Sequence, residues 1–165
     1  SSDLGYDVKK SEVHGMAQRG GSVTSHVRFG KKVYSPLIPD GEVDILFSFE
    51  LLETMRYLHL LRDDPVILVI NQKILPPSVT LGKDVYPDTI PELLAGRYKR
   101  FHLVNALDIA RQAGNAKALN VVFVGALSRF FDIPESVWQE AIAAMLPPKL
   151  VELNKKAFAM ARQPA

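Results

Sequence analysis

Two short hydrophobic runs, separated by a segment of helical periodicity, constrain the fold of this chain more than any other feature. Residues 43–49 and 66–70 are almost continuously apolar, which is typical of strands covered on both faces in a parallel or mixed sheet. Between them, apolar side chains recur at three- and four-residue spacing, which predicts a helix with one apolar stripe. That stripe consists of Leu51, Leu52, Met55 and Leu58. The pattern therefore predicts a strand–helix–strand unit in a parallel sheet.

The second half of the chain predicts one more strand and then a run of helices. Residues 101–104 form a short apolar run, Asn105 can cap the helix that follows, and Gly114 is suited to end it. Residues 119–130 are apolar at helical spacing, so we expect a helix there as well. After Pro134 we expect another helix with a buried stripe, formed by Val137, Trp138, Ala141, Ile142 and Met145. A last amphipathic helix follows it.

Upstream of these elements, the sequence predicts strands around a polar segment. Residues 22–29 alternate apolar and polar side chains and are rich in β-branched residues, which indicates a strand. Residues 6–8 also have strand character, and residues 33–34 predict a return strand after Gly30. Strands interleaved with helices, followed by helices alone, predict an α/β fold: a three-layer sandwich with a largely parallel sheet and a helical C-terminal part. We expect a single domain over residues 1–165.

Composition excludes several classes of function. The 165-residue chain has a net charge of +2 and its 20 basic residues are dispersed, so neither nucleic acid nor an anionic membrane is expected as a partner. It has no cysteine, so it offers no thiol nucleophile and none of the thiolates that normally hold an iron–sulfur cluster. Its apolar runs are far shorter than the roughly 20 residues that cross a bilayer, and no signal-peptide pattern is present. The histidines lack metal-ligand spacing, so no metal site is expected.

The least ordinary segment is residues 11–22, in which polar residues and three glycines separate two predicted strands. Glycines let backbone N–H groups approach a ligand, and an arginine can contact a phosphate or carboxylate with two hydrogen bonds. The segment is therefore a candidate for binding an anionic group. The candidate residues are His14, Gly15, Gln18, Arg19, Gly20 and Gly21, with Glu12 as a weaker one. Alternatively, the glycines serve tight turns, and Glu12, His14 and Arg19 pair with one another or with a neighbouring subunit.

Polar residues also follow two of the predicted strands. Glu50 comes after the first apolar run, and Asn71, Gln72 and Lys73 come after the second. Ligands of open α/β sheets bind at the carboxyl ends of the strands, so these four residues are weaker candidates for the site. Each has a structural alternative, since a carboxylate stabilises a helix N-terminus and polar residues are common in solvated loops. No serine-nucleophile, phosphate-binding or zinc motif is present, so independent catalysis is not expected.

The polar segment and its flanks resemble a known family. The most specific part is residues 11–21, and further segments that match are 25–28, 34–39, 44–53, 71–77, 105–106 and 125–128. With them, the chain resembles the gamma-type domain of the pyruvate and 2-oxoacid ferredoxin oxidoreductase family, and within it the beta subunits of the indolepyruvate enzymes. Members of that family open with a strand, a glycine-rich turn and a helix. None of these precedes Tyr6, so we expect the domain to lack that native N-terminal element.

The resemblance implies that the chain is the subunit without cofactors of an enzyme that oxidatively decarboxylates a 2-oxoacid, such as indolepyruvate or another arylpyruvate, to an acyl-CoA. It implies a large catalytic alpha subunit as partner, which carries thiamine diphosphate, magnesium and iron–sulfur clusters, with coenzyme A as co-substrate and ferredoxin as electron acceptor. A cytoplasmic hetero-oligomer is expected, with the isolated chain inactive. Two alternatives stay open: a stand-alone anion- or nucleotide-binding module, and a purely structural interface subunit.

Overall fold

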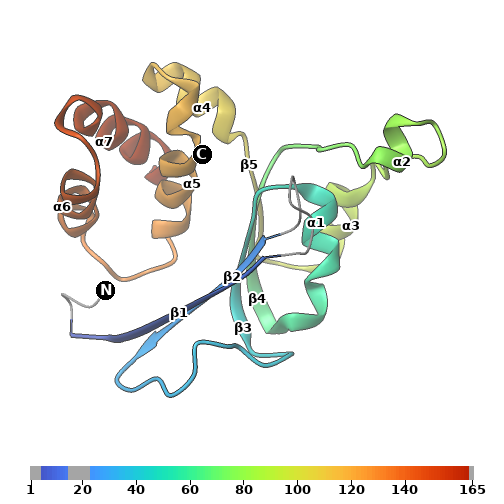
Figure 1. Ribbon diagram of the computed structural model, residues 1–165, viewed down its shortest axis with the longest axis horizontal. Helices are drawn as coiled ribbons and strands as arrows, with labels where there is room; N and C mark the ends of the chain where they lie inside the picture. The colour runs from blue at the N-terminus through green and yellow to red at the C-terminus, as the bar shows by residue number, and fades with distance from the viewer. Residues whose placement is uncertain (1–4, 15–22, 164–165) are drawn as a thin grey trace.

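A three-stranded parallel sheet lies at the centre of the part of the chain that the structure describes (Figure 1). The structure is a computed structural model that describes residues 5–14 and 23–163. The sheet has the order β3 (Val43–Ser48), β4 (Leu61–Ile70), β5 (Phe101–Val104). A separate antiparallel hairpin is formed by β1 (Asp7–His14) and β2 (Val23–Gly30). The helices are α1 (Leu51–Arg56), η2 (Leu58–Leu60), α2 (Pro77–Thr80), α3 (Ile90–Arg97), α4 (Ala106–Ala113), η3 (Ala116–Ala118), α5 (Leu119–Ser128), α6 (Glu135–Met145) and α7 (Pro148–Arg162).

The central strand β4 is covered on both faces, and its side chains separate two hydrophobic clusters. Ile67 and Val69 pack in one cluster with residues of α1 and α3. Leu68 and Ile70, which point to the opposite face because side chains alternate along a strand, pack in the other cluster with α4, α5 and α7. Figure 1 shows these two helical layers on opposite sides of the sheet. The predicted three-layer sandwich with a parallel sheet and a helical C-terminal part is therefore confirmed, including the β3–α1–β4 unit.

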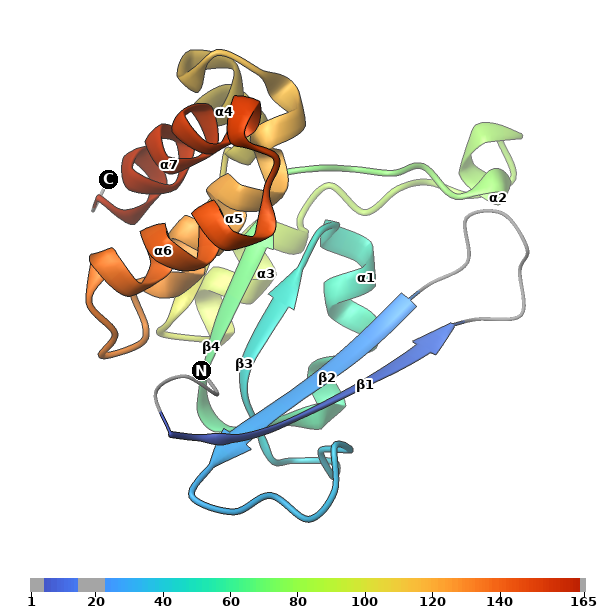
Figure 2. The ribbon, with the colours of Figure 1, turned by 60° about the vertical axis from the view of Figure 1, so that its left-hand side comes forward.

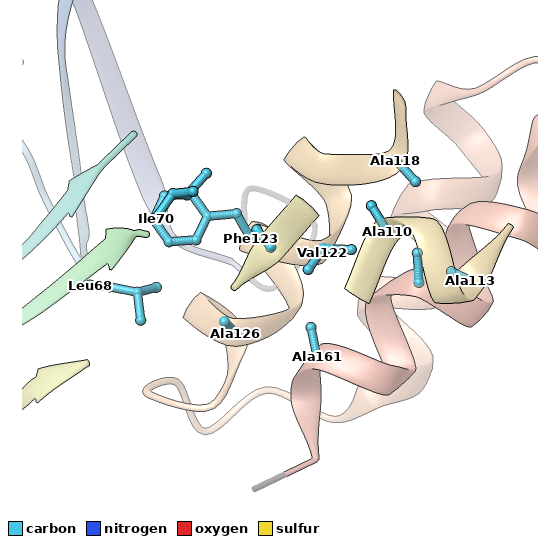
Figure 3. Packing of buried hydrophobic residues seen from close by; sticks show 11 residues of the cluster. Leu68, Ile70, Ala110, Ala113, Ala118, Val122, Phe123, Ala126 and Ala161 are labelled. Carbon is cyan, nitrogen blue, oxygen red and sulfur yellow. The ribbon is translucent and has the colours of Figure 1, made fainter. Parts of the chain in front are cut away.

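The C-terminal helices form a second core that is continuous with one face of the sheet (Figure 3). Phe123 of α5 is fully buried and stacks on Phe47 of β3, with ring centroids 3.9 Å apart. Helices α5 and α7 approach most closely at Gly125, where an added Cβ would lie 2.5 Å from the Phe158 carbonyl oxygen. Arg162 links the end of α7 to the end of α5 and to the segment before α6, because its guanidinium donates hydrogen bonds to the carbonyl oxygens of Ser128 and Ile133.

Helix α6 is less buried than its sequence pattern predicts. None of its eleven described residues is buried, and Met145, at the end of the predicted stripe, is 82% exposed. Trp138 does pack inward, since its ring lies 5.9 Å from that of Phe158 and 6.2 Å from that of Phe131. The prediction of a buried stripe was wrong: Val137, Trp138 and Ile142 are half-buried, and Ala141 and Met145 are exposed, because α7 is the main element packed against α6.

The predicted return strand at residues 33–34 is absent, and side chains of the hairpin hold this connection instead. Val33 donates its backbone N–H to the carboxylate of Asp7, and Ile38 donates its N–H to Nδ1 of His26. Arg28 donates to the carbonyl oxygen of Leu37 at 2.9 Å. Several backbone groups between the hairpin and β3 are therefore paired with side chains instead of with a neighbouring strand.

The close approach of α5 and α7 at Gly125 allows a prediction for the free energy of unfolding. A Gly125→Ala chain gains helix propensity worth about 1 kcal/mol, but its methyl group meets the Phe158 carbonyl and Ala161, and overpacking of a core costs about 1–3 kcal/mol. We expect net destabilisation and a lower Cm in urea unfolding. Gly96→Ala in α3, where an added Cβ meets no atom within 4 Å, is the matched control and is expected to stabilise the chain. Equal effects of the two substitutions would contradict the packing described for α5 and α7.

Candidate functional site

The three parallel strands end at one edge of the sheet, and polar residues follow each of them. Glu50 lies just beyond β3, Asn71 directly follows β4, and Asn105 directly follows β5. The backbone joins these ends, since Asn71 donates its N–H to the Val104 carbonyl and Leu51 donates its N–H to the Gln72 carbonyl. The structure therefore gathers the strand-end candidates at the carboxyl edge, where open α/β sheets bind ligands.

Glu50 is the most enclosed polar side chain at this edge, with 5% of its surface exposed. Its Oε2 accepts a hydrogen bond from the backbone N–H of Glu53, so Glu50 is the N-cap of α1. Its Oε1 accepts from the N–H of Ile74 and from the hydroxyl of Tyr86. Both oxygens are thus occupied by donors within the chain. Such a buried carboxylate is stabilised by its partners, and it ties the start of α1 to residues 74 and 86.

Tyr86 is the partner that sequence reasoning missed. Its ring is buried, and its hydroxyl lies 2.5 Å from Glu50 Oε1. Burial and the adjacent Glu50 carboxylate raise the pKa of the Tyr86 hydroxyl far above that of a free tyrosine. No sequence signal marks this contact, because Tyr86 lies 36 residues from Glu50 in a segment without periodicity.

Lys73, by contrast, lies on the surface beside this edge, and its partners are nearby residues of the chain. Its Nζ forms an ion pair with Asp88 at 2.5 Å and lies 5.6 Å from the centre of the Tyr86 ring. The ion pair is largely exposed, so its contribution to stability is small, about 0–1 kcal/mol. It nevertheless holds residues 73 and 88 together beside the Glu50–Tyr86 contact.

Asn71 and Asn105 face each other at the exposed end of the sheet. Asn71 Nδ2 donates to Asn105 Oδ1 at 2.9 Å. Asn105 occupies the N-cap position of α4 as predicted, but its side chain makes no capping hydrogen bond because it is turned toward Asn71. Asn71 and Gln72 are both exposed. These amides offer donors and acceptors to a ligand or to a neighbouring chain.

The candidate loop lies mostly outside the described residues, which include neither Gly15, Gln18, Arg19, Gly20 nor Gly21. Its two flanks are described: the backbones of His14 and Val23 pair at the end of the hairpin. Beside this end, Thr24 donates its hydroxyl to the hydroxyl of Tyr57, at the end of α1, at 2.7 Å. Glu12 forms an ion pair with Lys10, so one of the weaker candidates is engaged within its own strand.

The described histidines have structural contacts. His26 Nδ1 accepts from the N–H of Ile38, and His59 Nδ1 lies 3.0 Å from the Arg56 carbonyl oxygen. His102 packs against Phe130, and its burial, followed by the nearby positive charges of Arg129 and Arg100, lowers the pKa of its imidazole. Within residues 5–14 and 23–163, no group of three or more histidine, cysteine or acidic residues is placed to hold a metal ion. No helix in the same ranges is long and apolar enough to span a membrane.

Comparison with known proteins shows the family of the chain. Residues 1–163 match the family described as pyruvate ferredoxin/flavodoxin oxidoreductase. The chain belongs to the pyruvate ferredoxin/flavodoxin oxidoreductase family. This membership confirms the resemblance seen in the sequence and the prediction that the chain is a subunit of an oxidoreductase.

Curated relatives in the pyruvate ferredoxin/flavodoxin oxidoreductase family share one name. The indolepyruvate oxidoreductase subunit IorB of Archaeoglobus fulgidus is 42% identical over 161 residues, which cover 94% of this chain and 79% of the relative. The protein of the same name from Thermococcus kodakarensis is 37% identical over 162 residues, covering 93% of this chain and 79% of the relative.

Solved structures agree on the fold. The gamma subunit of a keto/oxoacid ferredoxin oxidoreductase from Geobacter sulfurreducens matches with a TM-score of 0.67 and 23% identity, covering 98% of this chain and 81% of that one. A 2-oxoglutarate:ferredoxin oxidoreductase from Magnetococcus marinus, solved with 2-oxoglutarate, coenzyme A and succinyl-CoA bound, matches with a TM-score of 0.64 and 18% identity. That match covers 96% of this chain and 25% of the longer one. At these identities the likeness shows a shared fold.

The raised pKa of Tyr86 predicts a specific loss of stability at high pH. An unfolded tyrosine ionises near pH 10, whereas folded Tyr86 stays protonated well above it, so its stabilising effect is complete below pH 10 and falls as the pH rises further. Linkage gives a fall of about 1.4 kcal/mol per pH unit for one proton. We expect urea unfolding between pH 8 and pH 11 to show this loss in the wild type and to show a shallower decline in Tyr86→Phe.

The exposed Tyr34 provides the control for this titration. A Tyr34→Phe chain is expected to follow the wild-type profile, because Tyr34 is 90% exposed and its substitution removes no buried contact. If Tyr86→Phe instead declined as steeply as the wild type above pH 10, the buried contact between Tyr86 and Glu50 would not be present in solution.

Proposed function

We propose that the chain is the small subunit of an indolepyruvate, or more broadly arylpyruvate, ferredoxin oxidoreductase. The observation that supports this most strongly is the 37–42% identity, over 92–94% of the chain, to curated relatives named indolepyruvate oxidoreductase subunit IorB. The overall reaction is oxidative decarboxylation of the 2-oxoacid, with transfer of the acyl group to coenzyme A and of electrons to ferredoxin.

In this proposal the cofactors are bound by a larger catalytic subunit and not by this chain. The chain has no cysteine, and cysteine thiolates are the usual ligands of iron–sulfur clusters, so the clusters belong on the partner, together with thiamine diphosphate and magnesium. Thiamine diphosphate, when bound there, supplies the stabilised carbanion that decarboxylation requires. The role of this chain is to complete the site and to contact anionic groups of the substrates.

Two segments of this chain are suited to that role. The loop His14–Gly21 carries Arg19, whose guanidinium can hold a carboxylate or phosphate with two hydrogen bonds, and we place it near the entrance for the 2-oxoacid or coenzyme A. The carboxyl edge of the sheet presents the exposed amides of Asn71 and Gln72. Glu50 supports this edge from inside, since both oxygens of its carboxylate accept hydrogen bonds from donors of the chain itself.

A purely structural subunit is the second candidate, and the engagement of Glu50 and Lys73 by partners within the chain favours it. In that case the loop and the edge would stabilise the complex without touching a substrate. A stand-alone anion- or nucleotide-binding module is less well supported, because it gives no account of the identity to oxidoreductase subunits.

Substitution of Arg19 separates these functions. The full-length chain and its large subunit are co-expressed, and arylpyruvate-dependent, coenzyme A-dependent reduction of a viologen dye is measured with and without this chain. We expect activity only with both chains, and Arg19→Ala to raise KM for coenzyme A or the 2-oxoacid by about tenfold or more, as expected for loss of a hydrogen bond to a charged group.

Arg111→Ala is the matched control, because Arg111 is an exposed arginine on α4, in the C-terminal helical layer. It is expected to leave assembly and both KM values unchanged. Weaker assembly of Arg19→Ala with unchanged KM and kcat would favour the structural subunit. Tight nucleotide binding by the isolated chain, with no added activity in the complex, would favour the stand-alone module.

A further inference from the structure

Residues 73–88, here called the arm, leave the carboxyl edge of the sheet and return to it. The arm contains the single short helix α2 and extends away from the rest of the molecule, as both views show (Figures 1 and 2). It separates the end of β4 from the start of α3. Its base adjoins Asn71 and Gln72, so it borders the candidate site.

The base of the arm is held by two hydrogen bonds to the body and by one ion pair between its own two sides. The Glu50 carboxylate accepts hydrogen bonds from the Ile74 N–H on the outgoing side and from the Tyr86 hydroxyl on the returning side. Lys73 and Asp88 form an ion pair across the base. Because one buried carboxylate holds both sides, the arm leaves the sheet in a defined direction.

The outer part of the arm is also internally ordered. The backbone N–H groups of Thr80 and Leu81 bond to the carbonyl oxygens of Pro76 and Pro77, and Lys83 donates its N–H to the Ser78 carbonyl. Gly82, with φ of +70°, allows the chain to turn back where other residues would be strained. An arm ordered before binding loses less conformational entropy when a partner covers it.

The arm carries large apolar side chains that nothing in the described chain covers. Leu81 is 70% exposed and Val85 is 91% exposed, and Ile74 and Leu75 are also more than half exposed. Four such side chains on one projecting segment differ from the scattered apolar residues of an ordinary surface, and they are typical of a protein contact. The charged residues of the arm are two lysines and two aspartates, so it has no net charge to favour a polyphosphate or an anionic lipid surface.

We infer that the arm is a docking element that packs its exposed apolar residues against the large catalytic subunit. This inference rests on the proposed function. In that function the cofactors are on the partner, so the partner must reach the carboxyl edge for any residue of this chain to act on the substrates. A chain that covers Asn71 and Gln72 also meets the arm beside them. A second copy of this chain at the same place would instead block the partner from the edge.

The test uses the full-length chain and its large subunit, purified separately, and measures the Kd of their association. The variant Leu81→Asp/Val85→Asp places two charges on the exposed face of the arm, and we expect its Kd to rise at least about tenfold, as for loss of anchor residues in an interface. The far-UV circular dichroism and Tm of the variant chain should match those of the wild type, since both side chains are exposed. Met145→Asp, an exposed apolar residue of α6, is the matched control and should leave the Kd unchanged.

The outcomes distinguish the inference from the proposed function. If the wild type binds the large subunit and the arm variant binds equally well, the arm inference is overturned and the proposed function stands. If the wild type does not bind the large subunit, the proposed function fails and the inference with it. If sedimentation shows that the variant loses self-association while its Kd for the large subunit is unchanged, the arm serves a second copy and the inference is overturned.

Discussion

The two-sided burial of β4 is the constraint on which the rest of the structure depends. Ile67 and Val69 are buried by a helical layer on one face, and Leu68 and Ile70 are buried by another on the opposite face. Both neighbours of β4 are parallel to it, and parallel strands need connections that cross over the sheet and place helices on its faces. All three strands then end at the same edge, which brings together residues that are far apart in the sequence.

At that edge, a single buried carboxylate organises the polar groups. Glu50 caps α1 and holds both sides of the arm, so both of its carboxylate oxygens have partners within the chain, and it stabilises the edge from inside. The groups that remain available to a ligand or partner are the outward-facing amides of Asn71 and Gln72 and the apolar side chains of the arm. In the proposed function these groups would form one part of a composite site, completed by the subunit that holds the cofactor.

Much of the fold could be predicted because local patterns and tertiary packing agree. The runs that became β3 and β4, the helix between them and the end of α4 at Gly114 were read from periodicity and glycine placement, and each is confirmed. The errors occurred where tertiary contacts decide: Val33 bonds to the Asp7 side chain instead of joining a ladder, and α6 packs mainly on α7, which leaves Met145 exposed. Glu50 was predicted at a helix start, but Tyr86 and the arm have no periodic signal, so their link to Glu50 was visible only in three dimensions.

The claim that this chain acts at its sheet edge as part of a larger enzyme is tested most directly by hydrogen–deuterium exchange of the full-length chain, alone and with its large subunit. Exchange reports local opening and burial along the backbone. The account predicts that added protection concentrates at residues 71–88, while α6 exchanges as it does in the free chain. Protection confined to the C-terminal helices, or none at all, would contradict it.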